Sequence, residues 1–334
     1  MPDFMKPNLY SFATKELSQD AFICWLLSWA APEYRQVDPA LHACGQGLVA
    51  ALLRKRLTSV PEVIHSVKVK RQYKRIDVIC IVNDEYVILI EDKTTSNNSK
   101  HQLATYLELI TKEFPPESYT IVPIYFKTHD QSSYASVLKN LYEVFTRGDF
   151  LAVLTDGIKN GVSNEIFLDY FAYLGGIEER VQAYLTKPVA DWKSSVLVWV
   201  GFFKHIQSEL GRGKWDQIPQ QFMAFWWGGH GDELVSKRYL QLNQKELQIR
   251  ISIKDESQRK ALRSQWAKRV IQAAKVQGIE LSRVKYREGK TMALASGSYL
   301  QVDKAGIVDM PATISYLRHV EDFLTNLAEP AQPV

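Results

Sequence analysis

The sequence predicts an α/β fold, and three observations support this. Two β-branched, apolar runs within residues 75–93 flank the polar tripeptide Asn83-Asp84-Glu85, a pattern typical of a β-hairpin with a short loop. Apolar residues recur at helical spacing before and after that hairpin. Short strand-like runs return in the C-terminal third of the chain. We therefore expect a core over residues 1–150, a helical extension packed on it over 151–210, and an α+β accessory region over 211–334.

The chain before the hairpin is expected to form two helices and a strand. The first helix begins at Thr14 or Ser18, buries a stripe that includes Phe22 and Trp25, and ends before Pro32. A second amphipathic helix spans about residues 41–57. The strand expected over residues 63–72 alternates apolar and basic side chains, as a half-exposed strand does.

The length of the hairpin loop decides which polar side chains share a face of the sheet. If the loop is the three residues 83–85, Val82 pairs with Tyr86, and Asp77 lies opposite Glu91 with Cβ atoms roughly 5 Å apart. Lys93 points to the same face, because side chains alternate along a strand. Asp92 points the other way and leaves its backbone carbonyl free near the site. A two- or four-residue loop without a bulge would place Asp77 on the opposite face.

Two carboxylates and one ammonium at the end of an apolar hairpin need a physical reason, since a buried charge is costly unless it is paired or bound to a metal. Carboxylate oxygens, with water in the remaining positions, suit Mg²⁺ or Mn²⁺. Such a cation would lower the pKa of a bound water and offset charge on a phosphoryl oxygen. Lys93 could orient that water, assist its deprotonation or stabilise developing charge. The alternative is a structural Asp–Lys–Glu cluster at a sheet edge.

A third helix and a further strand are expected after the hairpin. The polar residues from Thr94 to Ser99 form a loop beside the site, and a helix from about Ser99 to Glu113 carries Gln102 and Tyr106 on one face. Residues 119–126 are an apolar strand, central in the sheet and parallel to a neighbour. Residues 134–145 are expected to be helical.

The remainder of the chain changes from helical to mixed character. Residues 164–210 have a helical pattern, and the run Gly-Arg-Gly-Lys at 211–214 is the best linker candidate. The long helix expected over residues 256–277 has a basic face, which is either solvated or a nucleic-acid surface. Trp226-Trp227 is expected to pack in the core rather than stack on bases. The expected helices are 256–277 and 312–327, and the expected strands are 222–227, 238–242, 247–253, 284–287 and 292–295.

The hairpin and its neighbours resemble a known family. Asp77 followed by Glu91-Asp92-Lys93 on consecutive strands is similar to the PD-(D/E)xK nuclease superfamily, whose restriction-endonuclease-like core runs helix, antiparallel meander, helix and strand. Residues from about 15 to 127 follow that order, although Ile76 stands where Pro is usual. Gln102 to Tyr106 matches a Gln-x3-Tyr element of DNA-processing members. The opening residues 14–27 further resemble a bacterial branch of the superfamily.

This resemblance implies roles for named residues. Asp77, Glu91 and the Asp92 carbonyl would hold the metal, and Glu16 would be an accessory acid that reaches it directly or through water. Gln102 and Tyr106 would position the substrate phosphate or the nucleophilic water. The alternatives are a helix-dipole role for Glu16 and ordinary exposure on the helix for Gln102 and Tyr106.

Composition and charge bound the cellular setting and the partners. Three cysteines without paired spacing, no apolar run of membrane-spanning length and no signal-peptide layout lead us to expect a cytoplasmic protein without a membrane span. The net charge of +4 is too small to indicate nucleic-acid binding by itself. Basic residues before the hairpin form either a solvated face or a phosphate-contacting patch: Lys68, Lys70, Arg71, Lys74 and Arg75.

These observations together predict a Mg²⁺- or Mn²⁺-dependent nuclease that hydrolyses DNA phosphodiester bonds by metal-activated water, with DNA favoured over RNA as the partner. One alternative is a non-catalytic nucleic-acid-binding or scaffold protein on the same fold. Another is a nuclease subunit of a restriction or phage-defence complex that is active only with its partners. The sequence leaves open both a homodimer and an assembly with partner subunits.

Overall fold

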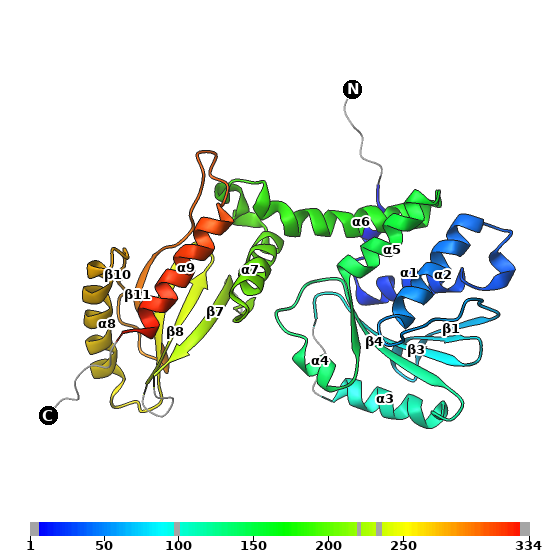
Figure 1. The fold of residues 1–334 in the computed structure, drawn as a ribbon, viewed down its shortest axis with the longest axis horizontal. Helices are drawn as coiled ribbons and strands as arrows, with labels where there is room; N and C mark the ends of the chain where they lie inside the picture. The colour runs from blue at the N-terminus through cyan, green and yellow to red at the C-terminus, as the bar shows by residue number, and fades with distance from the viewer. Residues whose placement is uncertain (1–6, 97–100, 219–221, 232–235, 328–334) are drawn as a thin grey trace. The chain divides into compact units, whose positions relative to one another are not determined.

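A computed structural model describes residues 7–96, 101–218, 222–231 and 236–327 of the chain. The chain forms two compact units, Met1–Glu178 and Glu179–Val334. The colours of Figure 1, which follow the residue number, let the reader locate each unit. The boundary lies within helix α6 (Glu165–Gln182). The stretch 151–210, expected as one helical extension on the core, is thus divided between the two units.

The first unit has the order of elements that the sequence predicts around the hairpin. The predicted start of the third helix at Ser99 lies outside the described residues, which place its beginning at Gln102. The elements are α1 (Glu16–Ser28), α2 (Pro39–Leu53), β1 (Val67–Tyr73), β2 (Ile76–Val82), β3 (Tyr86–Lys93), α3 (Gln102–Glu113), β4 (Thr120–Lys127), α4 (Ala135–Lys139), β5 (Glu143–Thr146), α5 (Arg147–Lys159) and α6.

The prediction of one helix over residues 134–145 is wrong. The chain forms the short helix α4 there, turns at Leu141 with a positive φ of 64°, and then adds β5 to the sheet. Val144 and Phe145 pair with β4, and their β-branched and aromatic side chains suit a strand beside an apolar neighbour. Tertiary pairing therefore outweighs the helical pattern of this stretch.

Five strands form the sheet of the first unit, in the order β1-β2-β3-β4-β5. The first three are antiparallel, and β4 lies parallel to β3, as the sequence predicts. Nearly all residues of β2 and β3 are buried, which explains why their apolar runs are almost unbroken. The predicted mixed α/β fold, with its restriction-endonuclease-like order of elements, is confirmed.

Helices cover both faces of this sheet, so the polar end of the hairpin is reached from two sides. Leu103 and Ile110 of α3 pack against Ile79 and Leu89 on one face. Helix α1 packs against β1, β2 and β3 on the other face. The two faces therefore expose alternate residues of β3 to different helices.

The second unit contains a six-stranded antiparallel sheet in the order β10-β11-β9-β8-β7-β6. The run 211–214 lies inside this unit rather than ahead of it, because Gly211 caps α7 and Lys214 opens β6. Residues 284–287 are not a strand. The elements are α7 (Val196–Leu210), β6 (Lys214–Gln217), β7 (Met223–His230), β8 (Ser236–Asn243), β9 (Glu246–Ile253), α8 (Arg259–Val276), β10 (Ser282–Arg283), β11 (Thr291–Ser298) and α9 (Met310–Thr325).

None of the helices in the described part of the chain has both the length and the apolar character needed to cross a membrane.

Candidate active site

The hairpin loop has the three-residue length on which the predicted site geometry depends. Val82 pairs with Tyr86, and the register continues to Val78 opposite Ile90, one step from Asp77 and Glu91. Asn83 and Asp84 adopt positive φ values of 57° and 52°, which Asn and Asp tolerate better than other side chains with a Cβ atom. The local sequence of the loop therefore sets the register, and the register brings Asp77 and Glu91 to one face.

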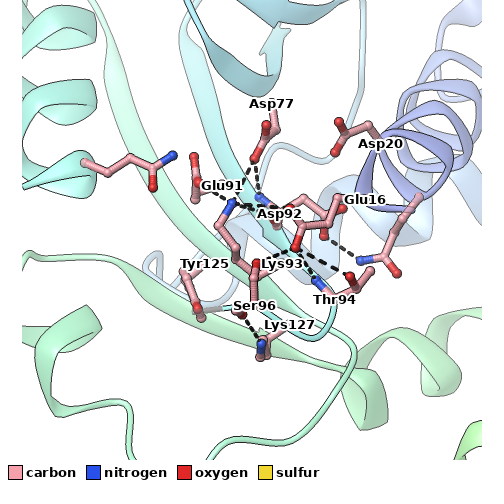
Figure 2. Close-up of polar contacts among 12 residues, drawn as sticks. Glu16, Asp20, Asp77, Glu91, Asp92, Lys93, Thr94, Ser96, Tyr125 and Lys127 are labelled. Atoms are coloured by element: carbon pink, nitrogen blue, oxygen red, sulfur yellow. Dashed lines mark hydrogen bonds and ion pairs between the residues drawn. The ribbon is translucent and has the colours of Figure 1, made fainter. Parts of the chain in front are cut away.

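The Lys93 ammonium lies among four oxygen-bearing groups at the end of β3, and Figure 2 shows it surrounded by the acids of the site. Its Nζ atom is 2.5 Å from Glu91 Oε1 and donates to the Asp92 carbonyl oxygen at 2.8 Å. Asp77 Oδ2 is 3.7 Å away and Glu16 Oε2 is 3.9 Å away. The Asp92 carbonyl, expected to be free, is thus occupied by the lysine of the same strand.

Burial would by itself lower the pKa of Lys93, but the contact with Glu91 and the charges of Asp77 and Glu16 raise that pKa above the usual lysine value. The amine is therefore held in its charged form. A positive charge at this point offsets the mutual repulsion of the surrounding carboxylates.

Glu91 is the acid of this group whose buried charge has the least compensation from hydrogen bonds. Its side chain is 0% exposed, and neither carboxylate oxygen accepts a hydrogen bond of good geometry from the described residues, so the Lys93 ammonium is its main compensation. Burial, followed by the charge of Asp77, raises the pKa of Glu91 to about 7. A buried carboxylate with an unused oxygen is a natural ligand for an added cation.

Asp77 is fixed from two directions. Its Oδ2 atom accepts a hydrogen bond from the Asp92 backbone N–H at 2.8 Å, across the two strands of the hairpin. Its Oδ1 atom accepts from Gln72 Nε2 at 3.1 Å, and the same amide group donates to Asp20 Oδ2 at 3.0 Å. The Asp77 carboxylate is therefore oriented before any ligand arrives.

Glu16 reaches the site from the first turn of α1. Its Oε1 atom accepts hydrogen bonds from the Thr94 backbone N–H at 3.2 Å and from Ser96 Oγ at 2.5 Å. The Ser96 carbonyl in turn accepts from Lys127 Nζ at 2.5 Å. The residues just after β3 thus hold Glu16 beside Lys93, which the sequence alone could only suggest.

The Asp92 side chain points to the opposite face, as expected from the alternation of the strand. Asp92 Oδ1 accepts a hydrogen bond from Gln19 Nε2 at 2.5 Å, and Gln19 Oε1 accepts from Thr128 Oγ1 at 2.9 Å and from Tyr170 Oη at 3.1 Å. Burial, followed by the charge of Asp20, raises the pKa of Asp92 well above the usual range. Burial and the charge of Asp77 raise the pKa of Asp20 to about 6. These two acids lie on the α1 side of the sheet, and Gln72 links Asp20 to Asp77.

Gln102 and Tyr106 lie one turn apart on α3 and face each other, with Gln102 Nε2 donating to Tyr106 Oη at 3.4 Å. Tyr142, which sequence reasoning did not select, lies near both Tyr106 and Glu91. Burial raises the pKa of Tyr142, and the charge of Glu91 raises it further. Tyr142 is therefore a common neighbour of Tyr106 on α3 and of Glu91 in the acid cluster.

Lys127 was also missed by the sequence analysis. It ends β4 in register with Lys93 on the parallel strand β3, and its side chain is only 1% exposed. Burial lowers the pKa of Lys127 to about 8. A charged residue closing an apolar strand parallel to β3 was the available signal, because the ends of adjacent parallel strands meet at one edge.

The basic residues before the hairpin lie on β1, at the edge of the sheet, and in the turn after it. Lys68 and Lys74 form ion pairs of 2.6 Å with Asp84 and Glu113. No such pair with a carboxylate involves Lys70, Arg71 or Arg75 within the described ranges. The predicted patch is therefore partly neutralised by the chain itself.

A divalent cation fits the donor set, although the chain does not form a complete cage for one. Within the described residues, no three His, Cys, Asp or Glu side chains gather into a ready metal site. Mg²⁺ and Mn²⁺ need only one or two carboxylates, since water fills their other positions. The unused oxygen of Glu91, the oriented Asp77 carboxylate and the nearby Asp92 carbonyl meet that requirement, with the Lys93 ammonium as the cation now among them.

Comparison with known proteins gives one family and no individual relative. No curated protein and no solved structure matches the chain. A family model of the PD-(D/E)XK nuclease superfamily matches residues 7–196, which include α1, the hairpin, α3 and β4. Because that match spans more than half of the sequence and contains every acid and lysine of the candidate site, this chain belongs to the PD-(D/E)XK nuclease superfamily.

Proposed function

We propose that the protein is a Mg²⁺- or Mn²⁺-dependent nuclease that hydrolyses phosphodiester bonds, with DNA as the favoured substrate. The observation that carries this proposal is the Lys93 ammonium held among Glu91, Asp77 and Glu16 at the end of the central hairpin. Three acids around one lysine, in a member of a nuclease superfamily, suit phosphodiester hydrolysis better than a structural cluster, because Glu91 remains poorly satisfied in the folded chain.

Asp77, Glu91 and the Asp92 carbonyl would hold the metal, and Glu16 would act on it directly or through water. When bound, the cation would supply Lewis acidity and make a water molecule easier to deprotonate. Glu91 and the Asp92 carbonyl become available to it when the Lys93 ammonium moves away from them.

Lys93 would then be free to orient the attacking water or to stabilise charge on the phosphoryl oxygens. Gln102 and Tyr106 would position the substrate phosphate, with Tyr142 closing the side of the site near Glu91. Lys70, Arg71 and Arg75 would contact the nucleic-acid backbone, and Lys68 and Lys74 would do so only after releasing Asp84 and Glu113.

The direct test is incubation of the full chain with linear duplex, circular and single-stranded DNA, and with RNA, in the presence of Mn²⁺ or Mg²⁺. We expect cleavage by the wild type and none by Lys93→Ala. The matched control is Lys159→Ala, an exposed lysine that forms a surface ion pair with Asp156. Because Lys93→Ala leaves Glu91 buried without its ammonium, Asp77→Asn serves as a second, nearly isosteric variant whose folding is checked by circular dichroism. Cleavage by Lys93→Ala at the wild-type rate would contradict the assigned roles.

Calorimetric titration with Mn²⁺ separates the nuclease from a scaffold protein on the same fold. We expect binding heat in the wild type and its loss in Asp77→Asn. No heat in the wild type would favour a non-catalytic nucleic-acid-binding protein. Metal binding without cleavage would favour a nuclease subunit that requires partner proteins.

A further inference from the structure

Among the described residues of the second unit, the hydrophobic core lies on one face of the sheet. Opposed residues along the strands share that face, as in the row Phe225, Leu242 and Leu247 and the row Trp227, Leu240 and Ile249. Helices α7, α8 and α9 all contribute side chains to the same core. All three helices therefore cover one face, and the residues between these rows point to the other face.

The outer face, as we call that second face, consists of polar, aromatic and basic rows. One row contains Lys214, Trp226, Gln241, Gln248 and Ser296, the next contains Tyr239, Arg250 and Ala293, and a third contains Lys237, Ser252 and Thr291. None of these residues belongs to the hydrophobic core. Trp226 and Tyr239 are partly exposed, so the expectation that both tryptophans of the 226–227 pair lie in the core holds for Trp227 alone.

Charge is distributed unevenly over the outer face. Lys214, Lys237 and Arg250 are its basic residues in these three rows, which contain no acid. The acids Asp216 and Glu246 are confined to a fourth row at one end of the strands. Each of these three rows thus has one basic residue, and two aromatic rings lie among the positive charges.

The central arginine of this face is held in place by its neighbours. Arg250 Nε donates to Tyr239 Oη at 3.2 Å, and its Nη1 donates to Gln248 Oε1 at 2.8 Å. Trp226 and Tyr239 are diagonal neighbours across adjacent strands, a spacing of roughly 7–8 Å between residues. A guanidinium held against Tyr239, with Trp226 on the strand beyond, provides charge and stacking surfaces on three adjacent strands without a large loss of side-chain freedom on binding.

We propose that the outer face of the second unit binds single-stranded nucleic acid, with bases stacked on Trp226 and Tyr239 and phosphates contacting Lys214, Lys237 and Arg250. Aromatic platforms within a basic surface are the usual means of binding unpaired strands, because every base has a stacking face and every nucleotide a negative charge. A duplex offers its phosphates but not its bases to a sheet face of this kind. The choice of a nucleic acid as the occupant rests on the nuclease function proposed above.

The test is fluorescence anisotropy of a labelled single strand of about 20 nucleotides titrated with the full chain. EDTA is present so that the strand is not cleaved. The length is about five times the smallest site of a single-strand-binding domain. We expect Trp226→Leu combined with Tyr239→Ala to weaken binding at least about tenfold, the loss that one stacked base entails. We expect Lys237→Ala combined with Arg250→Gln to reduce the salt dependence by about 1.4 in the log–log slope, as for two lost phosphate contacts.

The matched control is Lys268→Ala combined with Lys275→Ala, two exposed lysines on α8, which packs on the other face of the same sheet. This variant should bind the strand as the wild type does, and duplex DNA of the same length should respond less than the single strand to the aromatic changes. Parallel titrations with DNA and RNA strands tell which of the two is bound.

Unchanged strand binding in both outer-face variants would overturn the inference. So would a dimer in sedimentation that the aromatic variant dissociates without losing strand affinity, since the face would then belong to a second copy of the chain. The outcome is independent of catalysis: if no metal supports cleavage but the outer-face variants lose strand binding, the proposed nuclease function fails and this inference stands. If the wild type cleaves nucleic acid but the outer-face variants bind the strand as the wild type does, the proposed nuclease function stands and this inference fails.

Discussion

A single lysine makes the acid cluster compatible with a folded apolar hairpin. Glu91 is fully buried, and Asp77 and Glu16 are within 4 Å of the same ammonium. Removing one partner of a buried ion pair usually costs more than the pair contributes, because the remaining charge has no compensation. Lys93 therefore has a structural part in the metal-free chain, in addition to its proposed part in hydrolysis.

Lys127 leads to a prediction of pH dependence. Its pKa is about 8 in the folded chain and 10.5 in the unfolded chain. Between these values the unfolded chain binds more protons, so the free energy of unfolding rises with pH. We expect the wild type to gain stability relative to Lys127→Met from pH 8 to 10.5, measured by urea unfolding at several pH values in that window.

The exposed Lys159→Met variant is the control for Lys127, since Lys159 lies at the surface and forms an exposed ion pair with Asp156. Its stability difference from the wild type should not change across the same window. A Lys127→Met difference that is equally flat would show that the amine titrates normally in the folded chain.

At the scale of elements, Gln19 joins α1 to the central strand. Its side-chain amide donates to Asp92 on β3 and accepts from Thr128 after β4 and from Tyr170 on α6. The change Gln19→Leu leaves three buried polar groups without this partner, and we expect a loss of about 2–4 kcal/mol in the free energy of unfolding. Gln36→Leu, at an exposed position of the same unit, is the control and should change stability little. Urea unfolding measures both, and equal effects would contradict the assigned role.

The basic strand β1 gives a second prediction at this scale. Lys70, Arg71 and Arg75 form no ion pairs with carboxylates in the described part of the chain, whereas Lys68 and Lys74 do. Replacing the first three by Ala should reduce the log–log salt slope of duplex DNA binding by about 2.7, as for three lost phosphate contacts.

Replacing Lys68 and Lys74 by Ala should have a smaller effect per charge, because both ammonium groups must first leave an acid. Equal reductions per charge in the two variants would mean that the ion pairs seen in the free chain do not compete with DNA.

At the scale of the whole molecule, two compact units with separate hydrophobic clusters predict two unfolding transitions. Leu89 lies in the core of the first unit and Leu240 in that of the second. We expect Leu89→Ala and Leu240→Ala each to destabilise a different transition by about 2–5 kcal/mol in differential scanning calorimetry. Mn²⁺ should raise the midpoint of the first transition only, because a ligand stabilises the unit that binds it. A single transition that both variants shift alike would contradict this division.

The sequence predicted elements well where the pattern is local and failed where pairing decided the outcome. Residues 134–145 have helical spacing but supply β5, because the open edge of β4 was available to them. The glycines at 211–214 suggested a linker, yet Gly211 ends α7 and the run leads directly into β6 within one unit. The limits of the units were equally hidden, since helix α6 continues through the boundary at Glu178 without a break.

By itself the sequence determined the hairpin and, for the three-residue loop that the structure has, the shared face of Asp77, Glu91 and Lys93, because strand alternation is a local property. Only the tertiary structure decided that Lys127 and Tyr142 stand beside these acids. It also decided that Glu16 is held by the residues after β3 and that the described helices of the second unit gather on one face of its sheet. Those arrangements join segments far apart in the chain, and packing between elements, rather than the order of residues within one element, determines which of them meet.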